Sequence, residues 1–447
     1  FDEGAGFDDT DPRNAYGPYF QRQRVEIYHT YAKSLVERGL AYPCFCTEEE
    51  LDKVRAKQEE DKVLTGYYGE YATCRNLSYE EIEANIKAGK PYVLRLRSQG
   101  SPDKEITFVD AIKGEIKLPE NIHDIVLLKK DGIPTYHFAH AIDDHLMRTT
   151  TVVRGGEWLA SAPIHYELFH LLGFKMPAYA HTAHLMKFDE ETGGKRKLSK
   201  RKDPELSLDY YRKDGYHPYT MKVYLLTLLN SNFEEWHEKF PDKDINEFPF
   251  SVEKMNQSGA LFAKDKLHNI CKNELSKLSE EELYDFLYDW ARENEPENVE
   301  KWFGDREKML QILRLYMGVG AKRRRKDLMY AKQIFELISY FFDGESAEEM
   351  DEFKLDEDMV SKILKSYLAK YDHNDDNSVW FNKLKEIADE HGFASDMKAY
   401  KANPENFKGN VSDIAEAVRI AVTGRANTPD LWTIVHIMGE EQMTERI

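Results

Sequence analysis

The sequence predicts a mixed α/β fold in the first part of the chain and an all-α fold in the second. An alternating run at 92–97 and short apolar runs at 106–109 and 125–128 are separated by glycine and proline, a pattern typical of strands. From about residue 275 onward, apolar residues recur every three or four positions, which is typical of helices that pack on one face. The length of 447 residues is sufficient for about three domains.

Helices are also expected among the strands of the first part. An amphipathic helix is expected over 21–39, where Gly39 can end it. Thr47 and Glu50 have the spacing of a capping box, which begins a second, highly charged helix. Helical spacing returns at 157–172 and 205–230. In the second part the expected apolar helix faces contain Leu283, Phe286 and Leu287, then Ile334, Leu337, Ile338 and Phe341, and then Ile414, Val418 and Ala421.

The composition restricts the class of protein. Apolar residues make up 41% of the chain, but no run approaches the ~20 apolar residues of a membrane span, so no membrane partner is expected. Four cysteines do not form a disulfide framework, which favours a reducing, cytoplasmic location. A net charge of −19 disfavours non-specific binding to nucleic acid. A polynucleotide partner would therefore need a local basic patch.

Residues 193–202 form a basic loop in which two glycines precede six cations and one serine. The glycines give the loop mobility. Ammonium groups on flexible stems suit phosphates whose charge changes during a reaction. The alternative interpretation is an ordinary solvated run of charge.

The loop also carries a recognisable motif. Residues 197–201, Lys-Leu-Ser-Lys-Arg, resemble the Lys-Met-Ser-Lys-Ser signature of class I aminoacyl-tRNA synthetases, in the variant usual for bacterial-type glutamyl enzymes. The segments 131–139, 143–147, 153–159 and 163–165 resemble the second half of the Rossmann-type catalytic domain of those enzymes. The resemblance extends over essentially the whole chain.

This resemblance implies a glutamate–tRNA ligase. Such an enzyme activates L-glutamate with ATP and Mg²⁺ to glutamyl-adenylate and transfers the glutamate to the 3′ end of tRNA-Glu. We expect a monomer. The implied regions are the rest of the first catalytic half (1–42), an α+β acceptor-binding insert (43–128), the second catalytic half (129–182), an all-α stem-contact domain with the 197–201 motif (183–275), and a helical anticodon-binding region (276–447).

The resemblance also implies roles in ATP binding. Lys200 matches the lysine that steadies the ATP phosphates, and Lys197 and Ser199 match residues that support it in catalysis. Glu157 and Trp158 match residues that contact ATP. Leu185 falls where the family has a backbone contact to adenine.

Other matched residues belong to the glutamate pocket. Arg154 matches the arginine that holds the amino acid, and its fork can bind a carboxylate with two hydrogen bonds. Tyr136 matches a tyrosine of the same pocket; the alternative is a core tyrosine with a bonded hydroxyl. His140 stands where some relatives have Asn. Taken alone, Asp143–His145 could be a metal or acid–base cluster, but the resemblance explains it without a metal ligand.

Cys44, Cys46 and Cys74 lie where some relatives bind zinc with Cys-x-Cys and Cys-x-His. Asn76 replaces the expected histidine, so a fourth ligand would have to come from Tyr68, Glu70 or Tyr71. The alternative is three unbound thiols. Cys271 is expected to be a buried small apolar residue.

The tRNA contacts are expected in the helical region. Lys322, Arg323, Arg324, Arg325, Lys326 and Arg419 are the candidate RNA-binding residues, since unstacked anticodon bases can be bound by arginine and aromatic side chains. The alternative for the basic run 322–326 is a solvated helix surface. In glutaminyl enzymes this region resembles β-barrels, whereas the sequence here predicts no strands in it.

The family's other signature, a His-x-Gly-His-like motif, does not occur in this sequence. We therefore expect that the N-terminal part of the catalytic domain is missing and that the chain as given is incomplete for activity. The segment 8–11 is expected to be a surface turn. Two alternatives to a glutamate–tRNA ligase remain: a truncated homologue that binds tRNA without catalysis, and a glutaminyl-tRNA synthetase.

Overall fold

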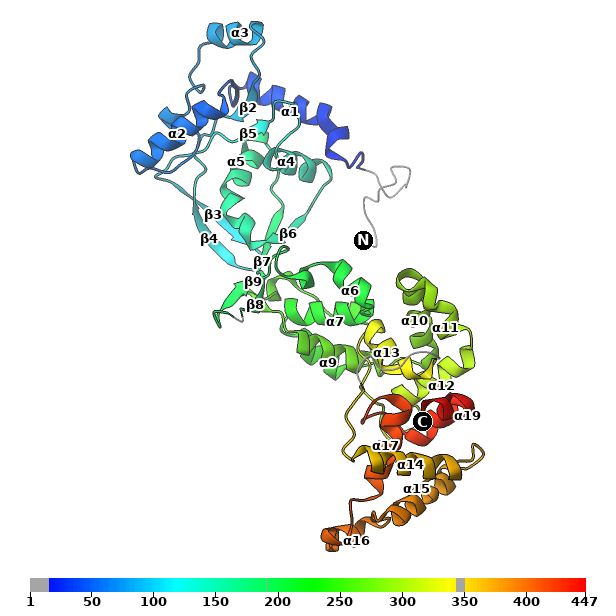
Figure 1. Ribbon diagram of the computed structural model, residues 1–447. Helices are drawn as coiled ribbons and strands as arrows, with labels where there is room; N and C mark the ends of the chain where they lie inside the picture. Colours follow the sequence, from blue (N-terminus) through cyan, green and yellow to red (C-terminus); the bar gives the residue numbers. More distant parts are fainter. Residues whose placement is uncertain (1–15, 190, 343–349) are drawn as a thin grey trace. The chain divides into compact units, whose positions relative to one another are not determined.

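The computed structural model describes residues 16–189, 191–342 and 350–447. It divides into two compact units, Phe1–Met186 with Leu228–Leu261, and Lys187–Thr227 with Phe262–Ile447. Figure 1 shows the longer strands in the first unit and helices throughout the second, as the sequence predicts. The predicted turn at 8–11 and the start of the 1–42 region lie outside the described residues. No described helix is long and apolar enough to cross a membrane.

Two sheets organise the first unit. An antiparallel sheet has the order β1-β2-β5, and a mixed sheet has the order β4-β3-β7-β6, in which β3 and β6 both run parallel to β7. The apolar run predicted at 106–109 lies in β3, which alternates buried and exposed residues. The strand bounds are β1 Ala41–Cys44, β2 Val93–Leu96, β3 Glu105–Asp110, β4 Gly114–Pro119, β5 Val126–Leu128, β6 Thr151–Gly155 and β7 Ala178–Thr182.

The alternation predicted at 92–97 is wrong within β2. Leu94, Arg95 and Leu96 are buried in succession, because both faces of this strand are covered. The Arg95 guanidinium lies 4.0 Å from the centre of the Tyr67 ring. Burial of this arginine is compatible with a strand because the guanidinium also donates a hydrogen bond to the Asp124 carbonyl at 2.9 Å.

Among the helices of the first unit, α2 begins where its capping residues predict. Thr47 and Glu50 form the expected capping box, and the predicted helix over 21–39 is a 3₁₀ turn followed by α1. α1, α4 and α5 share one apolar core with β2 and β5. The bounds are α1 Val25–Glu37, α2 Glu48–Glu60, α3 Tyr79–Lys87, α4 Tyr136–Leu146, α5 Ala162–Leu172 and α8 Phe233–Lys239.

The all-α prediction for 183–275 is wrong in one respect, because this region contains three short strands. They are β8 (Leu185–Phe188), β9 (Lys195–Lys197) and β10 (Ala260–Leu261). β10 pairs with β8 in parallel, with Ala260 opposite Leu185. Each strand is only two to four residues long, too short for a periodic pattern to be visible in the sequence.

In the second unit the helices after residue 275 pack around one apolar core, and the described residues there form no strand. All three predicted apolar faces lie on helices or on the 3₁₀ turn after α13. The bounds are α6 Leu208–Asp214, α7 Pro218–Leu229, α9 Lys264–Leu275, α10 Glu280–Asn294, α11 Val299–Phe303, α12 Arg306–Met317, α13 Ala331–Ile338, α14 Glu357–Lys370, α15 Asn377–His391, α16 Met397–Ala402, α17 Val411–Thr423, α18 Leu431–Met438 and α19 Glu440–Arg446.

Candidate active site

Arg154 lies near the end of β6, among imidazole and aromatic side chains of the first unit. β6 pairs with β7 so that Arg154 is opposite His181. Arg154 Nε donates a hydrogen bond to His181 Nε2 at 2.9 Å, and Nη1 donates to His165 Nδ1 at 3.1 Å. The guanidinium carbon lies 4.7 Å from the centre of the Tyr179 ring. Two imidazoles and one aromatic face therefore fix the direction of this cation.

Behind Arg154, His181 is bonded to Asp110, and both side chains are fully buried. His181 Nδ1 donates to Asp110 Oδ2 at 2.6 Å. Asp110 also accepts hydrogen bonds from the backbone amides of Ile112 at 3.0 Å and Lys113 at 2.9 Å. Burial acts to raise the pKa of Asp110, but the hydrogen bonds outweigh it and hold the pKa below its ordinary value. Asp110 is therefore an ionised acceptor that orients His181.

His165, on α5, extends the network to α4. Its ring is fully buried, and its Nε2 lies 2.9 Å from Nδ1 of His137. Burial, together with the charges of His140 and Arg154, lowers the pKa of His165 to about 2. Burial also lowers the pKa of His137. Both imidazoles are therefore neutral at neutral pH.

Tyr136 begins α4 and remains 45% exposed, so the alternative of a core tyrosine is wrong. Its ring centre lies 4.4 Å from that of Trp158, and its ring is nearly parallel to His140 at 5.6 Å. Among the described residues its hydroxyl has no hydrogen-bond partner. Tyr136, Trp158 and Arg154 therefore lie close together, with one phenol hydroxyl available to a ligand.

His140 is held by the protein through both ring nitrogens. Nε2 lies 2.7 Å from the Tyr179 hydroxyl, and Nδ1 lies 2.7 Å from Asp144 Oδ2. The predicted contact of His140 with glutamate stays a prediction. A protein oxygen lies close to each nitrogen, so a ligand that bonds to either nitrogen must displace that oxygen.

The other predicted ATP contacts of the first unit lie beside this group. Glu157 follows β6 directly, is half-exposed, and lies 3.5 Å from Nδ1 of His184. Leu185 begins β8 next to that histidine. Their roles in ATP binding stay predictions.

The alternative of a metal or acid–base cluster at Asp143–His145 is wrong, because the three side chains have separate partners. Asp143 accepts hydrogen bonds from Arg24 at 2.9 Å and from the Tyr28 hydroxyl at 2.7 Å. His145 stacks on the Phe174 ring at 3.7 Å. These contacts join α4 to α1 and to the loop after α5.

The basic loop of the second unit is built around Asp203, which sequence reasoning missed. Asp203 accepts two hydrogen bonds from Arg196, both at 2.7 Å, and one from the Ser199 amide at 2.8 Å. The Arg196 guanidinium holds the pKa of Asp203 well below its usual range. Leu198 is buried, whereas Lys200 is exposed and forms no ion pair with any described residue. The loop therefore presents Lys200 on a backbone that Asp203 fixes.

Cys44, Cys46 and Cys74 lie together, with their sulfur atoms within 4.8 Å of one another. Two hydroxyls lie beside them: that of Tyr67 is 3.4 Å from Cys44 Sγ and 3.3 Å from Cys46 Sγ, and that of Thr73 is 3.2 Å from Cys46 Sγ alone. The suggested substitutes Tyr68 and Tyr71 are wrong for this position, since their hydroxyls bond to the Leu64 carbonyl and to Asp61, and Glu70 is exposed. Hydrogen bonds from the other two thiols, and also from Tyr67, lower the pKa of Cys44. Cys271 is fully buried, as predicted.

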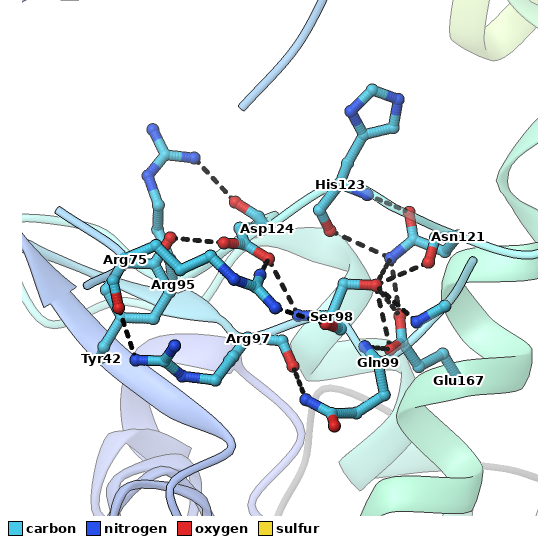
Figure 2. A network of polar contacts seen from close by, with 11 residues as sticks. Tyr42, Arg75, Arg95, Arg97, Ser98, Gln99, Asn121, His123, Asp124 and Glu167 are labelled. Atoms are coloured by element: carbon cyan, nitrogen blue, oxygen red, sulfur yellow. Dashed lines mark hydrogen bonds and ion pairs between the residues drawn. The ribbon is translucent and has the colours of Figure 1, made fainter. Parts of the chain in front are cut away.

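A polar network joins the predicted insert to the helix that carries His165 (Figure 2). Glu167 of α5 accepts hydrogen bonds from the Gln99 amide at 2.6 Å, from Asn121 at 2.7 Å and from the Ser98 hydroxyl. Burial raises the pKa of Glu167, although the hydrogen bonds act to lower it. Asp124, fully buried, continues the network toward Arg75 and Tyr42. The network and the pairing of β3 with β7 both cross the predicted border at residue 128, and that border stays a prediction.

The basic run 322–326 is a loop between α12 and α13, so the alternative of a helix surface is wrong. Gly318, with a φ of +66°, ends α12 just before it. Lys322, Arg323 and Arg324 are exposed and form no ion pair with any described residue. Arg325 is bonded to Asp327 at 2.7 Å, and Lys326 to Asn273 at 2.7 Å. Arg323 and Arg325, with Arg314 and His436, also line a hollow of about 750 Å³.

Arg419 differs from these exposed cations. It is half-buried, and its Nη1 donates hydrogen bonds to the carbonyls of Thr428 and Pro429 at 3.0 and 3.3 Å. Burial lowers the pKa of Arg419. Its contact with RNA stays a prediction, and its observed contacts fix the loop between α17 and α18.

Comparisons with known proteins agree with this arrangement. Residues 6–269 match the family described as tRNA synthetases class I (E and Q), catalytic domain, and residues 282–447 match an anticodon binding domain. The chain is 53% identical to the glutamate–tRNA ligase of Acetivibrio thermocellus, over 100% of this chain and 81% of that protein. It is 46% identical to that of Clostridium perfringens strain 13, over 100% and 82%.

The chain belongs to the glutamate–tRNA ligases, within the class I tRNA synthetases. A crystal structure of a glutamate tRNA ligase from Elizabethkingia meningosepticum, in complex with its amino acid, superposes with a TM-score of 0.73 at 26% identity. The match covers 97% of this chain and 83% of that one. The described residues after 275 form helices and no strand, which differs from the β-barrel form expected for the glutaminyl alternative.

Proposed function

We propose that this protein activates glutamate with ATP to glutamyl-adenylate and transfers the glutamate to tRNA-Glu. The observation that carries the proposal is Arg154, a guanidinium held in place by neutral partners beside the exposed ring of Tyr136. Such a cation can bind a carboxylate of the amino acid through its remaining N–H groups. The tyrosine hydroxyl supplies a further donor.

The loop at 197–201 is proposed to supply the charge for the ATP phosphates. Lys200 is exposed on a backbone that Asp203 and Arg196 hold. Pre-organised cations of this kind stabilise charge that develops on phosphate oxygens. Mg²⁺ would enter with the ATP, and Lys197, Ser199, Glu157, Trp158 and Leu185 are proposed to assist in binding the nucleotide.

The experiment is ATP–pyrophosphate exchange by the full-length protein, with tRNA-Glu present and with glutamate or glutamine as substrate. Exchange with glutamate supports the proposal, and exchange with glutamine alone contradicts it. Lys200→Ala should reduce the exchange rate by about a hundredfold, since one such donor contributes ~3 kcal/mol. It should leave tRNA affinity unchanged. Lys202→Ala removes an exposed cation of the same loop and should have little effect.

Bound zinc is the finer proposal for the three cysteines. Their sulfurs and the Tyr67 hydroxyl supply four donors. In a tetrahedral site with Zn–S bonds of 2.3 Å the sulfurs lie about 3.8 Å apart, and Cys46 and Cys74 are 3.5 Å apart. Zinc would act here as a structural clamp on the insert. Measuring the zinc content of the purified protein tests this proposal.

The remaining assignments are proposals of the same kind. The exposed cations at 322–324 are proposed to contact the RNA backbone, with the adjacent hollow available to an unstacked base. The five regions predicted from the sequence are proposed as functional regions. A monomer in the cytoplasm remains the expected form.

A further inference from the structure

We propose that His165 and His181 are positioning residues that hold the Arg154 guanidinium for the substrate carboxylate, with Asp110 orienting His181. This inference rests on the proposed function, because it assigns the amino-acid carboxylate to Arg154. It adds three residues to the site from the centre of the first unit, none of which was given a role from the sequence.

The direction of each hydrogen bond follows from arginine chemistry. A guanidinium only donates, so the two imidazole nitrogens that it contacts must both be acceptors. The contact atoms are Nε2 of His181 at 2.9 Å and Nδ1 of His165 at 3.1 Å. Both rings are therefore neutral, and each carries its proton on the other nitrogen.

The second nitrogen of each ring has a partner that fixes this tautomer. Nδ1 of His181 donates to the buried carboxylate of Asp110 at 2.6 Å. Nε2 of His165 donates to Nδ1 of His137 at 2.9 Å. Each acceptor nitrogen is thus kept unprotonated by the hydrogen bond on the opposite side of its ring.

Neutral partners leave the cation available. A carboxylate at either position would form an ion pair with Arg154 and compete with a carboxylate of the substrate. The imidazoles accept hydrogen bonds without adding negative charge, and among the described residues Arg154 has no acidic partner within ion-pair distance. Nη2 makes only a long contact, 3.5 Å to the Trp158 carbonyl. The Nη2 end of the guanidinium is therefore available to bind the substrate carboxylate.

Burial keeps the arrangement neutral. Both rings are fully buried, and burial lowers the pKa of each. Desolvation disfavours the charged imidazolium, and the adjacent guanidinium disfavours it further. Protonation of either ring would replace an acceptor by a donor and break its bond to Arg154.

Two matched pairs of variants test the proposal. Asn and Leu have similar shapes, and the Asn oxygen can occupy the place of the His165 Nδ1 acceptor. His165→Leu should raise the KM for glutamate about tenfold, the cost of one lost hydrogen bond to a charged group. kcat and the KM for ATP should change less than about twofold, and His165→Asn should restore most of the loss. For His181 the corresponding pair is Met and Gln.

The outcomes distinguish failure of the proposed function from failure of the positioning role. A wild-type protein that gives no exchange with glutamate contradicts the proposed function itself. If the wild type is active and the Leu and Asn variants are equally impaired, or both have the wild-type KM, the positioning role is overturned. If the variants are unstable, a measurement on the wild type still tests the positioning role. Nitrogen-15 NMR of labelled histidines should show neutral rings at both positions near pH 7, and an imidazolium at either would overturn the proposal.

Discussion

The carboxylate of Glu167 accepts a hydrogen bond from the backbone amide of Gln99 at 2.6 Å, across 68 residues of sequence. Glu167 lies on α5 two residues after His165, so one helix connects the insert to the Arg154 site. Since Asn121 and Ser98 donate to the same carboxylate, three donors of the insert depend on it.

Replacing Glu167 by Leu should destabilise this junction, because buried donors would lose their acceptor at about 1–3 kcal/mol each. We expect a total loss of roughly 3 kcal/mol, and a smaller loss for Glu167→Gln, which keeps one acceptor. Hydrogen exchange of β2, β5 and α5 is the measurement. Glu115→Leu, an exposed glutamate on β4, is the control and should leave that exchange unchanged. Equal protection in wild type and Glu167→Leu would show that the network carries no stability.

Zinc content tests the cysteine cluster. The purified full-length protein should hold about one zinc per chain, and Cys46→Ser should lose it because a hydroxyl is a poor substitute for a thiolate. Tyr67→Phe should weaken retention against a chelator without abolishing binding, since three sulfurs remain. Cys271→Ser, at a buried thiol outside the cluster, should retain the metal. If wild-type protein grown in zinc-containing medium holds no zinc, the zinc proposal is contradicted and the alternative of three unbound thiols is correct.

The basic loop at 322–326 should give tRNA binding a steep salt dependence despite the acidic composition. Replacing Lys322, Arg323 and Arg324 by Ala should weaken tRNA-Glu binding and reduce the slope of log K against log salt by roughly 2, because each phosphate contact contributes ~0.7–0.9. Fluorescence titration at several salt concentrations is the measurement. Removing Lys362, Lys398 and Lys401 instead subtracts the same charge elsewhere in the unit. A similar loss in that control would show that only net charge matters.

The residues that could be identified from the sequence alone are those that lie in local motifs. Tyr136, Arg154 and Trp158 belong to the matched segments and lie close together, and the predicted capping box at Thr47 is present. Asp110 and His181 could not be identified in this way, because their hydrogen bond joins two strands 71 residues apart and neither residue lies in a local sequence pattern.

The form of the basic run was partly visible in the sequence. Charge alone does not distinguish a helix from a loop, but Gly318 and Gly320 precede the run, and both adopt a positive φ. Tyr67 was missed for a different reason. The substitutes expected from the sequence were Tyr68, Glu70 and Tyr71, whereas the hydroxyls of both tyrosines bond to other partners in the structure.

The buried histidines should make the first unit sensitive to acid. The native pKa of His165 is about 2, whereas an unfolded histidine has a pKa of ~6.5. As the pH falls below the unfolded value, the unfolded state gains a proton that the native state does not, so stability is lost toward acid. Between pH 7 and pH 5 this single group should lower the free energy of unfolding by about 2 kcal/mol.

Urea unfolding at both pH values, followed by hydrogen exchange of β6 and β7, measures this loss. Carboxylates titrate as well, so the quantity of interest is the difference between wild type and His165→Asn. The variant should be less sensitive to the change from pH 7 to pH 5 by about 2 kcal/mol. His170→Asn removes an exposed histidine from the same helix and should keep the wild-type pH dependence. Identical pH dependence in His165→Asn and wild type would mean that His165 takes up its proton in the folded protein, and the neutral acceptor assigned to Arg154 would be lost with it.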